Sequence, residues 1–343
     1  YTVINVPYSA LMGVISPHSE ERTVVSTFRF VAAFVGQFIV QFAVLRLVSV
    51  FGKGNEQIGW QWTMAVMAGL SVVLWLVTFA TTKERVKPVK GQKNPLKQDL
   101  ADLSKNVPWL LIGSATIFQL LFNVIRGGSI MYYFKYFVQD QQLFLFGKPH
   151  SYSYQTLTST FMLTGTLITI VGSLLTSFFS KRIGKSRSYW GFLGISAICS
   201  ALFFFLKPQD VVWMFLLQII ASFCMGPVSV LQWAIYTDTA DYSEWRTGRR
   251  ATALIMAVSL FALKLGIALG GSILAWILDI YGFEANVAQT ARSLTGIRMV
   301  MSIYPAIAGM IGVILMTFYP LNNTKMLQIE KDLSARRQET ATE

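Results

Sequence analysis

Charged residues are scarce in this chain: they make up 13% of its 343 residues, whereas a soluble protein carries about 25%. The two cysteines, Cys199 and Cys224, both fall within apolar stretches, so we predict small packing residues rather than a disulfide or a metal pair. The sequence contains no Cys/His cluster, no Walker loop and no dinucleotide fingerprint. These absences argue against a metalloprotein, a nucleotide-binding enzyme and a soluble fold.

Long apolar runs take the place of the missing charge. Hydrophobic residues make up 53% of the chain, and a transmembrane helix needs about 20 of them in succession. Eight runs approach or exceed this length, and a ninth, at the N-terminus, is shorter. The runs predict an all-α polytopic membrane protein with about eight full spans and a partial one. The expected spans are 1–16 (partial), 28–50, 58–82, 108–138, 154–180, 189–206, 212–236, 251–280 and 297–320.

The 29 lysine and arginine residues are distributed unevenly between the intervals that separate these runs. Most of them lie in alternate intervals, and few lie in the intervals between. Because basic residues are retained on the cytoplasmic side, we predict that the basic intervals and the C-terminus are cytoplasmic, in a bacterial inner membrane. The net charge of +12 then reports topology rather than nucleic-acid binding. The basic intervals are 17–28, 82–107, 181–188, 237–250 and 321–343.

The interval 83–107 divides the chain. It is the longest polar stretch between spans, it is basic, and it contains Pro88 and Pro95. Six spans follow it and fewer precede it, which is the outline of a transporter built from two helical bundles. The chain opens at Tyr1 inside an apolar run, so we expect a fragment that lacks its true N-terminus. The predicted units are the remainder of an N-terminal bundle (1–82), a central cytoplasmic loop (83–107), a C-terminal six-helix bundle (108–320) and a cytoplasmic tail (321–343).

Two basic residues fall near the middle of apolar runs. Lys264 is central in 251–280, where an ammonium group costs about 3 kcal/mol or more unless it faces a polar cavity or a partner inside the bundle. Arg126 is deep in 108–138 and is followed by two glycines. We predict that Lys264 marks a transport pathway or ligand site. We predict that Arg126 faces a cavity and binds an anionic substrate group, with a structural ion pair as the alternative.

Three carboxylates, Asp238, Asp241 and Glu244, follow the 212–236 run at helical spacing. No nucleophile or histidine accompanies them, so catalysis is not the favoured interpretation. We predict that they form ion pairs with a basic interval and thereby close the cytoplasmic side of the protein while the opposite side is open. The predicted partners in that interval are Lys181, Arg182 and Lys185.

Three strings resemble the glycoside–pentoside–hexuronide:cation symporter family of the major facilitator superfamily. Residues 1–9, YTVINVPYS, are similar to its fourth helix, and residues 230–246, VLQWAIYTDTADYSEWR, are similar to the end of its tenth helix. Residues 263–266, LKLG, are similar to its eleventh helix. The resemblance covers essentially the whole chain in order. It implies the major facilitator fold, with two six-helix bundles, and a chain that begins within the fourth helix.

By this resemblance, the site of the coupling cation includes Thr2, Asn5 and Lys264. Asn5 stands where the family has a cation-binding aspartate, and an amide offers a carbonyl oxygen but no charge. It therefore binds Na⁺ less strongly than a carboxylate does, and it cannot carry a proton. The resemblance implies Na⁺ or H⁺ as the coupling cation, with no other cofactor and no metal beyond a possible Na⁺ site. Hydrogen bonding of Asn5 and Thr2 to neighbouring helices is the alternative.

The resemblance places the substrate beside Tyr8, Ser9, Arg29, Arg126 and Lys264. Tyr8 offers an aromatic face and a hydroxyl group, which suit a pyranose ring, whereas Ser9 lacks the stacking surface found in the family. Arg29 brings five fixed donors for vicinal hydroxyls or a carboxylate. For Arg29, snorkelling at the cytoplasmic end of its span is the alternative.

These features predict a secondary transporter, not an enzyme, that moves a sugar, glycoside or sugar acid together with a cation by alternating access. We expect a small-molecule sugar or glycoside and the lipid bilayer as its partners, and neither nucleic acid nor an obligate protein partner. A lipid or lysolipid carrier on the same fold is one alternative. A membrane-embedded enzyme and a transport-inactive sensor are others.

Overall fold

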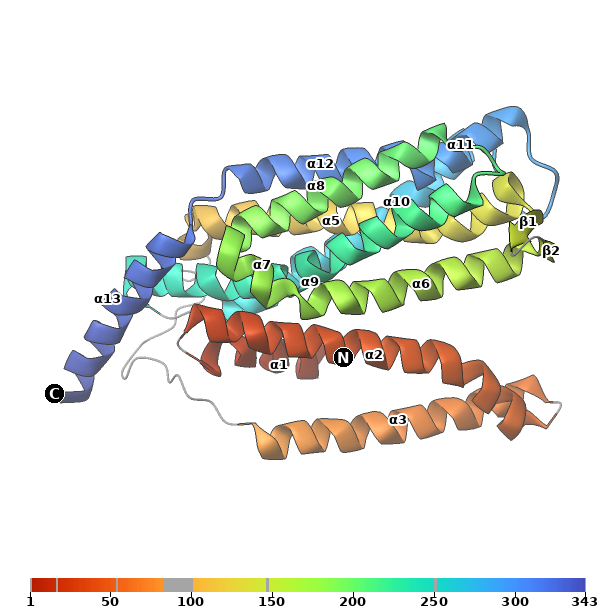
Figure 1. Cartoon of the computed structure of the whole chain (residues 1–343). Helices are drawn as coiled ribbons and strands as arrows, with labels where there is room; N and C mark the ends of the chain where they lie inside the picture. Colours follow the sequence, from red (N-terminus) through yellow and green to blue (C-terminus); the bar gives the residue numbers. More distant parts are fainter. Residues whose placement is uncertain are drawn as a thin grey trace.

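The protein is mostly helical in the computed structural model, which describes residues 2–16, 18–53, 55–82, 101–145, 148–249 and 252–342 (Figure 1). A π-helix, η1 (Tyr133–Val138), a 3₁₀-helix, η2 (Phe203–Phe205), and the antiparallel strands β1 (Gln141–Leu145) and β2 (Lys148–Tyr152) lie between the α-helices. The α-helices are α1 (Thr2–Val14), α2 (Ser19–Gly52), α3 (Glu56–Thr81), α5 (Val107–Tyr132), α6 (Tyr154–Leu174), α7 (Thr176–Ile183), α8 (Lys185–Leu202), α9 (Val211–Thr247), α10 (Thr252–Ile280), α11 (Ala291–Met301), α12 (Ile303–Thr317) and α13 (Asn323–Thr342).

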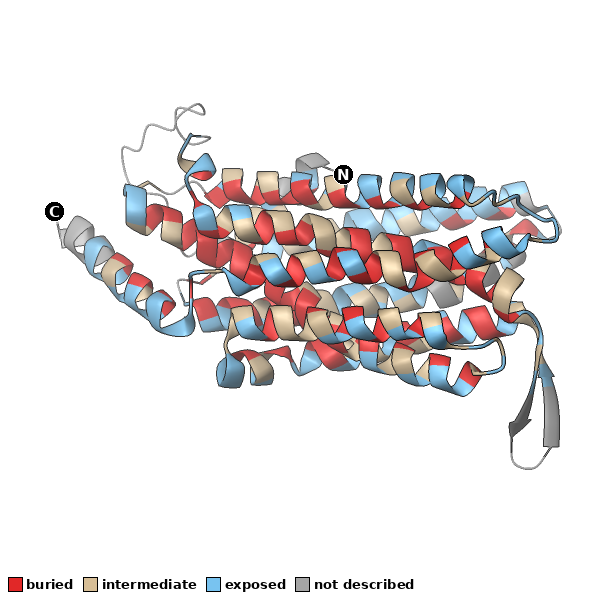
Figure 2. Ribbon diagram, turned by 90° about the horizontal axis from the view of Figure 1, so that it is seen from above, coloured by how far each residue is buried: buried red, intermediate tan, exposed pale blue. Residues whose placement is uncertain are grey.

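Eight helical segments in the described part of the chain are long and apolar enough to cross a bilayer. This confirms the polytopic all-α class. Large apolar side chains such as Phe79 and Trp276 are exposed along them, as expected for helices that face lipid tails rather than water. Figure 2 shows exposed residues on the outer faces of the helices and buried residues between them. The segments are Ser19–Val40, Gln57–Thr81, Val107–Val138, Tyr154–Leu174, Lys185–Phe205, Val211–Thr247, Thr252–Ile280 and Ala291–Thr317.

Helices α5 to α12 form one bundle, beside which α1, α2 and α3 lie (Figure 1). Within the bundle, α5 packs against α10 and α12, and α9 packs against α6 and α8. Helix α2 contacts α3 on one side and α6 and α9 on the other, while α1 contacts α10. The contacts of α1 and α2 with α6, α9 and α10 therefore form an interface between segment 1–82 and the C-terminal bundle.

Small residues let helices of the bundle approach closely. A Cβ atom added to Gly226 on α9 would lie 2.5 Å from the carbonyl oxygen of Thr169 on α6. One face of α10 packs in the same way against α5, because a Cβ atom added to Gly266 would lie 2.9 Å from the Cβ of Leu120. Close approach of backbones is the usual basis of helix packing in lipid, where the hydrophobic effect gives little drive for association.

Two helices extend beyond the apolar runs of the sequence. Helix α2 begins at Ser19 rather than at residue 28, and α9 continues to Thr247 rather than ending at residue 236. Gly248, with φ of 70°, follows α9 and permits the left-handed turn that ends it. The three carboxylates expected in a loop at 237–250 lie within α9 instead. Hydropathy marks only the apolar part of a helix, whereas these extra turns are polar and packed against other helices.

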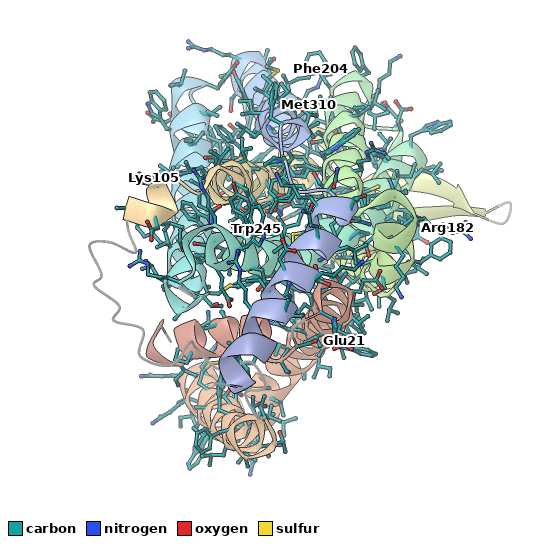
Figure 3. The ribbon with its side chains drawn as sticks, turned by 90° about the vertical axis from the view of Figure 1, so that its left-hand side faces the viewer. Glu21, Lys105, Arg182, Phe204, Trp245 and Met310 are labelled. Atoms are coloured by element: carbon teal, nitrogen blue, oxygen red, sulfur yellow. The ribbon has the colours of Figure 1, made fainter. Side chains whose placement is uncertain are left out.

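The tail expected at 321–343 is the helix α13, which docks against α9. Figure 3 looks onto this end of the molecule and shows α13 crossing it toward α2. Of the expected central loop, residues 83–100 lie outside the described residues, and Val107 already belongs to α5. A small buried cluster holds α13 in place; it consists of Leu321, Met326, Ile329 and Leu333, packed against Tyr242 and Trp245.

Candidate functional site

Arg29 on α2 lies between two aromatic rings that belong to different helices. Its guanidinium carbon is 4.6 Å from the centre of the Tyr8 ring on α1 and 4.5 Å from the centre of the Trp233 ring on α9. Each such contact contributes about 0.5–2 kcal/mol. The stacking fixes the plane of the guanidinium group, whose edge carries five N–H donors. Arg29 therefore joins α1, α2 and α9 at the interface.

Arg29 lies about 15 Å along α2, because the helix begins at Ser19, before the apolar run that starts at residue 28. Its side chain is half-buried. The flanking contacts of Arg29 are aromatic rings of other helices, which favours a role inside the protein over snorkelling at a helix end.

Tyr8 has a second aromatic neighbour that the sequence does not single out. The ring of Trp75 on α3 meets the Tyr8 ring edge to face, with centroids 5.0 Å apart. Both residues line a mainly apolar groove of about 550 Å³ between α1 and α3, together with Pro7 and Phe79. Trp75 stands in a uniformly apolar run, so no pattern in the sequence distinguishes it from a lipid-facing tryptophan.

Ser9 and Asn5 contact each other on α1. Both are buried, and the Ser9 hydroxyl donates to the Asn5 side-chain oxygen over 3.5 Å. Positions 5 and 9 are one turn apart on α1, so they share a face of the helix. The hydrogen bond described for the Ser9 side chain is thus to Asn5 and not to Tyr8 or Arg29. The side chain of Thr2, the other predicted cation ligand, lies outside the described part of the chain.

The side chain of Lys264 on α10 is exposed in the described structure, and its role as a pathway or ligand residue stays a prediction. Gly266 and Gly270 mark the face of α10 that packs on α5. A side chain two residues before Gly266 points to the other side of the helix. Helix α10 also contacts α1, so Lys264 and Asn5 lie on neighbouring helices.

Arg126 lies inside the C-terminal bundle, away from Arg29. Its Nη2 donates to the side-chain oxygen of Gln218 on α9 over 2.6 Å, and its guanidinium carbon is 5.3 Å from the centre of the Phe203 ring. Gln218 and Trp233 are separated by about 22 Å along α9. The structure therefore does not bring Arg126 to the other predicted substrate residues, because a partner within its own bundle holds it.

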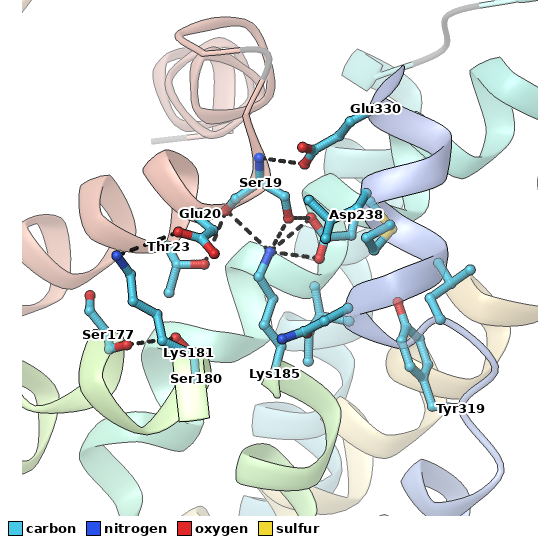
Figure 4. Close-up of a pocket in the computed structure, with 15 residues that line it drawn as sticks. Ser19, Glu20, Thr23, Ser177, Ser180, Lys181, Lys185, Asp238, Tyr319 and Glu330 are labelled. Atoms are coloured by element: carbon cyan, nitrogen blue, oxygen red, sulfur yellow. Dashed lines mark hydrogen bonds and ion pairs between the residues drawn. The ribbon is translucent and has the colours of Figure 1, made fainter. Parts of the chain in front are cut away.

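A charged cluster, made of Arg22, Lys185, Asp238 and Asp241, joins three helices at the end that carries α13. Figure 4 shows two of its members, Lys185 and Asp238, together with Ser19. Lys185 Nζ at the start of α8 is 2.8 Å from Asp238 Oδ2, and Arg22 Nη2 on α2 is 3.2 Å from Asp238 Oδ1. Arg22 also pairs with Asp241. The Ser19 hydroxyl donates to Asp238 over 2.5 Å. The expected pairing of Asp238 with Lys185 is present, whereas Asp241 pairs with α2.

The charged cluster is almost dry. Arg22 is completely buried, and Asp238 and Asp241 are each 3% exposed. Two cations and two carboxylates balance one another there, which is the condition under which buried charges are tolerated. Arg22 is the residue that the sequence does not identify. Its only signal is that Asp238 and Asp241, three residues apart on one helical face, both require a cation.

Two of the other predicted members, Lys181 and Arg182, make their described contacts outside the charged cluster. Lys181 pairs with Glu20 over 3.4 Å, but both side chains are mostly exposed, so the pair contributes little. Arg182 stacks on Phe178 with its guanidinium carbon 4.5 Å from the ring centre. Glu244 is buried two turns beyond the start of the polar segment of α9.

Helix α13 reaches the N-terminus of α2 through Glu330. The backbone N–H of Ser19 donates to Glu330 Oε1 over 2.6 Å, where a carboxylate is favourable because it meets the first amides of a helix. Burial raises the pKa of Glu330, with nearby Asp238 acting in the same direction, while the Ser19 hydrogen bond, Arg22 and Lys185 oppose the rise. On its other side, α13 accepts a hydrogen bond from Trp245 Nε1 at Asp332, over 2.8 Å.

Comparison with known proteins decides the family. Residues 1–323 match the model of a family described as MFS/sugar transport protein. The chain belongs to this family. It is 32% identical over 340 residues to the putative glycoside/cation symporter YagG of Escherichia coli strain K12, which covers 98% of this chain and 70% of YagG. It is 30% identical over 336 residues to the inner membrane symporter YicJ of the same strain, with 97% and 70% covered.

A further relative is the isoprimeverose transporter of Lactiplantibacillus pentosus, which is 29% identical over 328 residues, with 94% of this chain and 65% of that protein covered. The resemblance to the glycoside–pentoside–hexuronide:cation symporters is thereby confirmed. Proteins of this family are transporters and not enzymes. Together with the eight apolar helices, the family shows an integral membrane protein that transports sugars on the major facilitator fold.

Proposed function

We propose that the protein is a secondary active transporter that carries a sugar, glycoside or sugar acid together with a cation. The observation that carries this proposal is the position of Arg29 between Tyr8 and Trp233. Aromatic rings suit the apolar face of a pyranose, and a fixed guanidinium edge suits vicinal hydroxyls or a carboxylate. The names of YagG and of the isoprimeverose transporter support a glycoside as substrate and a cation as partner.

Alternating access is supported by the partners of the charged cluster. Arg22 belongs to α2, whereas Asp238 and Asp241 belong to α9, so the pairs cross the interface. Rocking of the two bundles would separate them and open this end of the molecule. We propose that this end is cytoplasmic, since it carries the basic intervals, and that the protein resides in a bacterial inner membrane.

For the coupling cation we propose a site near Asn5, with Thr2 as a further oxygen ligand and Lys264 on the neighbouring helix. A neutral amide binds Na⁺ only with the help of other oxygens, and it does not take up a proton at neutral pH. We keep both Na⁺ and H⁺ as candidate coupling cations. Asn5→Asp should raise the response of uptake to Na⁺, because it adds a hard anionic ligand.

The decisive experiment is uptake and counterflow by the full-length protein in proteoliposomes. A panel of neutral glycosides and glucuronides is offered under an imposed Na⁺ or pH gradient. Arg29→Gln should lower uptake by about tenfold or more, since charge-assisted contacts are lost, and the loss should be larger for a glucuronide if a carboxylate is bound. Arg292→Gln, an exposed arginine at the opposite end, serves as the control.

Two results would contradict the proposal. Counterflow of a lysolipid but of no sugar would indicate a lipid carrier on the same fold. Binding of a sugar without counterflow would indicate a sensor that does not transport. Unchanged sugar uptake in Arg29→Gln would remove Arg29 from the substrate site, even if the protein transports sugar.

A further inference from the structure

A second open cavity lies beside the charged cluster. Unlike the apolar groove beside Tyr8, it is lined by basic residues. Its volume is about 520 Å³, which is within the range of roughly 300–1,000 Å³ typical of small-molecule sites. One wall is formed by residues 182–187 and Trp190, from the end of α7 and the start of α8. The other is formed by Met316, Thr317 and residues 319–324, from the end of α12 to the start of α13. We call it the basic cavity. It lies outside the interface that carries Arg29.

The walls of the basic cavity carry positive charge without a carboxylate. Its basic residues are Arg182, Lys185 and Arg187, and none of the residues found to line it is an aspartate or a glutamate. Lys185 is neutralised by Asp238. Arg182 and Arg187 form no ion pair with any residue that the structure describes. Two positive charges thus remain at the cavity, a surplus that favours an anion.

Uncharged donors point to the same kind of ligand. Helix α8 begins at Lys185, directly after Gly184, and no side chain caps its first amides. The first N–H groups of a helix lack partners within it and are a ready site for phosphate.

The basic cavity lies at the ends of membrane-spanning segments, and this position indicates which kind of molecule carries the anion. The membrane-spanning segments of α8 and α12 begin or end at its walls, at Lys185 and Thr317. Trp190 lies in the same wall, and tryptophan is enriched at the level of lipid headgroups. The cavity also has more room than an inorganic phosphate ion needs. We propose that the basic cavity binds the phosphate of an anionic phospholipid headgroup.

The experiment measures lipid binding by the full-length protein purified in detergent, using native mass spectrometry with added phosphatidylglycerol. Each arginine removed should weaken binding by about fivefold, since a basic residue near anionic lipid contributes about 1 kcal/mol. The variants are Arg187→Gln and Arg182→Gln with Arg187→Gln. Arg187→Lys should retain most of the affinity, because a lysine still serves phosphate as a point charge.

The matched control is Lys331→Gln, an exposed basic residue of α13 outside the cavity walls, which should bind phosphatidylglycerol as well as the unchanged protein does. Zwitterionic phosphatidylethanolamine should bind more weakly and should not distinguish the variants. Equal weakening by Lys331→Gln, or unchanged binding in the double variant, would overturn the site. Displacement of phosphatidylglycerol by an equal concentration of inorganic phosphate would assign the cavity to a soluble anion and overturn the lipid as its ligand.

Discussion

Polar contacts at the interface between segment 1–82 and the C-terminal bundle differ from those inside that bundle. At the interface, Arg22 on α2 pairs with Asp238 on α9. Inside the bundle, Arg126 on α5 donates to Gln218 on α9, so both partners move together. Rocking of two bundles breaks contacts of the first kind and preserves those of the second. The same residue type therefore forms a contact across the interface in one region and a contact within one bundle in the other.

The largest effect on this contrast is expected from Arg22→Gln. Asp241 would lose the Arg22 guanidinium inside a buried site, and breaking such a pair costs about 3–5 kcal/mol. States in which this end of the interface opens and water reaches Asp241 should therefore be favoured. Ser177 lines the pocket beside the charged cluster, so alkylation of Ser177→Cys should become faster by about tenfold or more.

Arg126→Gln, with the same Ser177→Cys substitution, provides the comparison, and its alkylation rate should not change. Adding Asp241→Asn to Arg22→Gln should restore slow alkylation, since it removes the unpaired carboxylate. If Arg22→Gln alone leaves the rate unchanged, the ion pairs do not hold this end closed.

A second large effect should come from Lys264→Ala on α10, the helix that contacts α1. We expect coupled uptake to be abolished while expression and insertion stay intact, because the exposed ammonium makes no large contribution to packing. Lys264→Arg should rescue only partly, since a planar guanidinium does not reproduce a compact ammonium. Uptake in vesicles, normalised to protein level and measured across pH, is the assay. Near-normal coupled uptake by Lys264→Ala would show that this lysine is tolerated rather than used.

Arg126→Gln should have a smaller effect, on the stability of the protein rather than on transport. The change removes a charged hydrogen-bond donor from Gln218, a loss of about 1.5–3 kcal/mol in the free energy of unfolding. Uptake per folded molecule and the substrate concentration for half-maximal uptake should stay the same, because the contact lies within one bundle. Denaturation in detergent and uptake by the same preparation test both halves of the expectation. A selective loss of uronide uptake would return Arg126 to the substrate site.

The smallest effect concerns Glu330 and is a dependence on pH. Burial holds the pKa of Glu330 above its ordinary value when α13 is docked, so the docked state binds the proton more tightly than the undocked state. Docking is therefore strongest below the ordinary pKa of glutamate and weakens as pH rises through the raised pKa. Cleavage by trypsin at Lys331, normalised to an unfolded substrate, should become faster over that window.

Glu330→Gln should remove this dependence, because a neutral amide resembles the protonated acid at every pH. The groups that face Glu330 are the Ser19 N–H, Arg22, Lys185 and Asp238, and all of them remain in the variant. The same pH profile in Glu330→Gln and in the unchanged protein would assign the dependence to another group.

The eight spans could be predicted because hydropathy is a local property of the chain. The pairing of Asp238 with a basic residue of the interval 181–188 could also be predicted, from charge and spacing alone. The partner of Asp241 could not, because Arg22 lies more than 200 residues away in sequence. The same limit applies to Arg126. Its position deep in an apolar run was evident from the sequence, but its partner Gln218 is uncharged and cannot be recognised from the pattern of charges.

The docking of α13 and the stack around Arg29 were hidden for another reason. Polar sequences such as 321–343 are typical of solvated tails, and only a few apolar residues spaced along α13 contact α9. Trp233 is one aromatic residue among many in apolar runs. A cation–π contact depends on how helices are placed relative to one another, which local propensity does not determine.

Lys185 is shared by two neighbouring sites. Its ammonium group contacts Asp238, and its side chain also lines the basic cavity. An anion in the cavity attracts the same ammonium, so occupancy of the cavity and closure of the charged cluster must alter one another by the same factor. The charge of the membrane lipids would then influence the transport cycle. Transport rates measured in neutral and in anionic membranes would differ, because the equilibrium between the closed and open states of the charged cluster would differ.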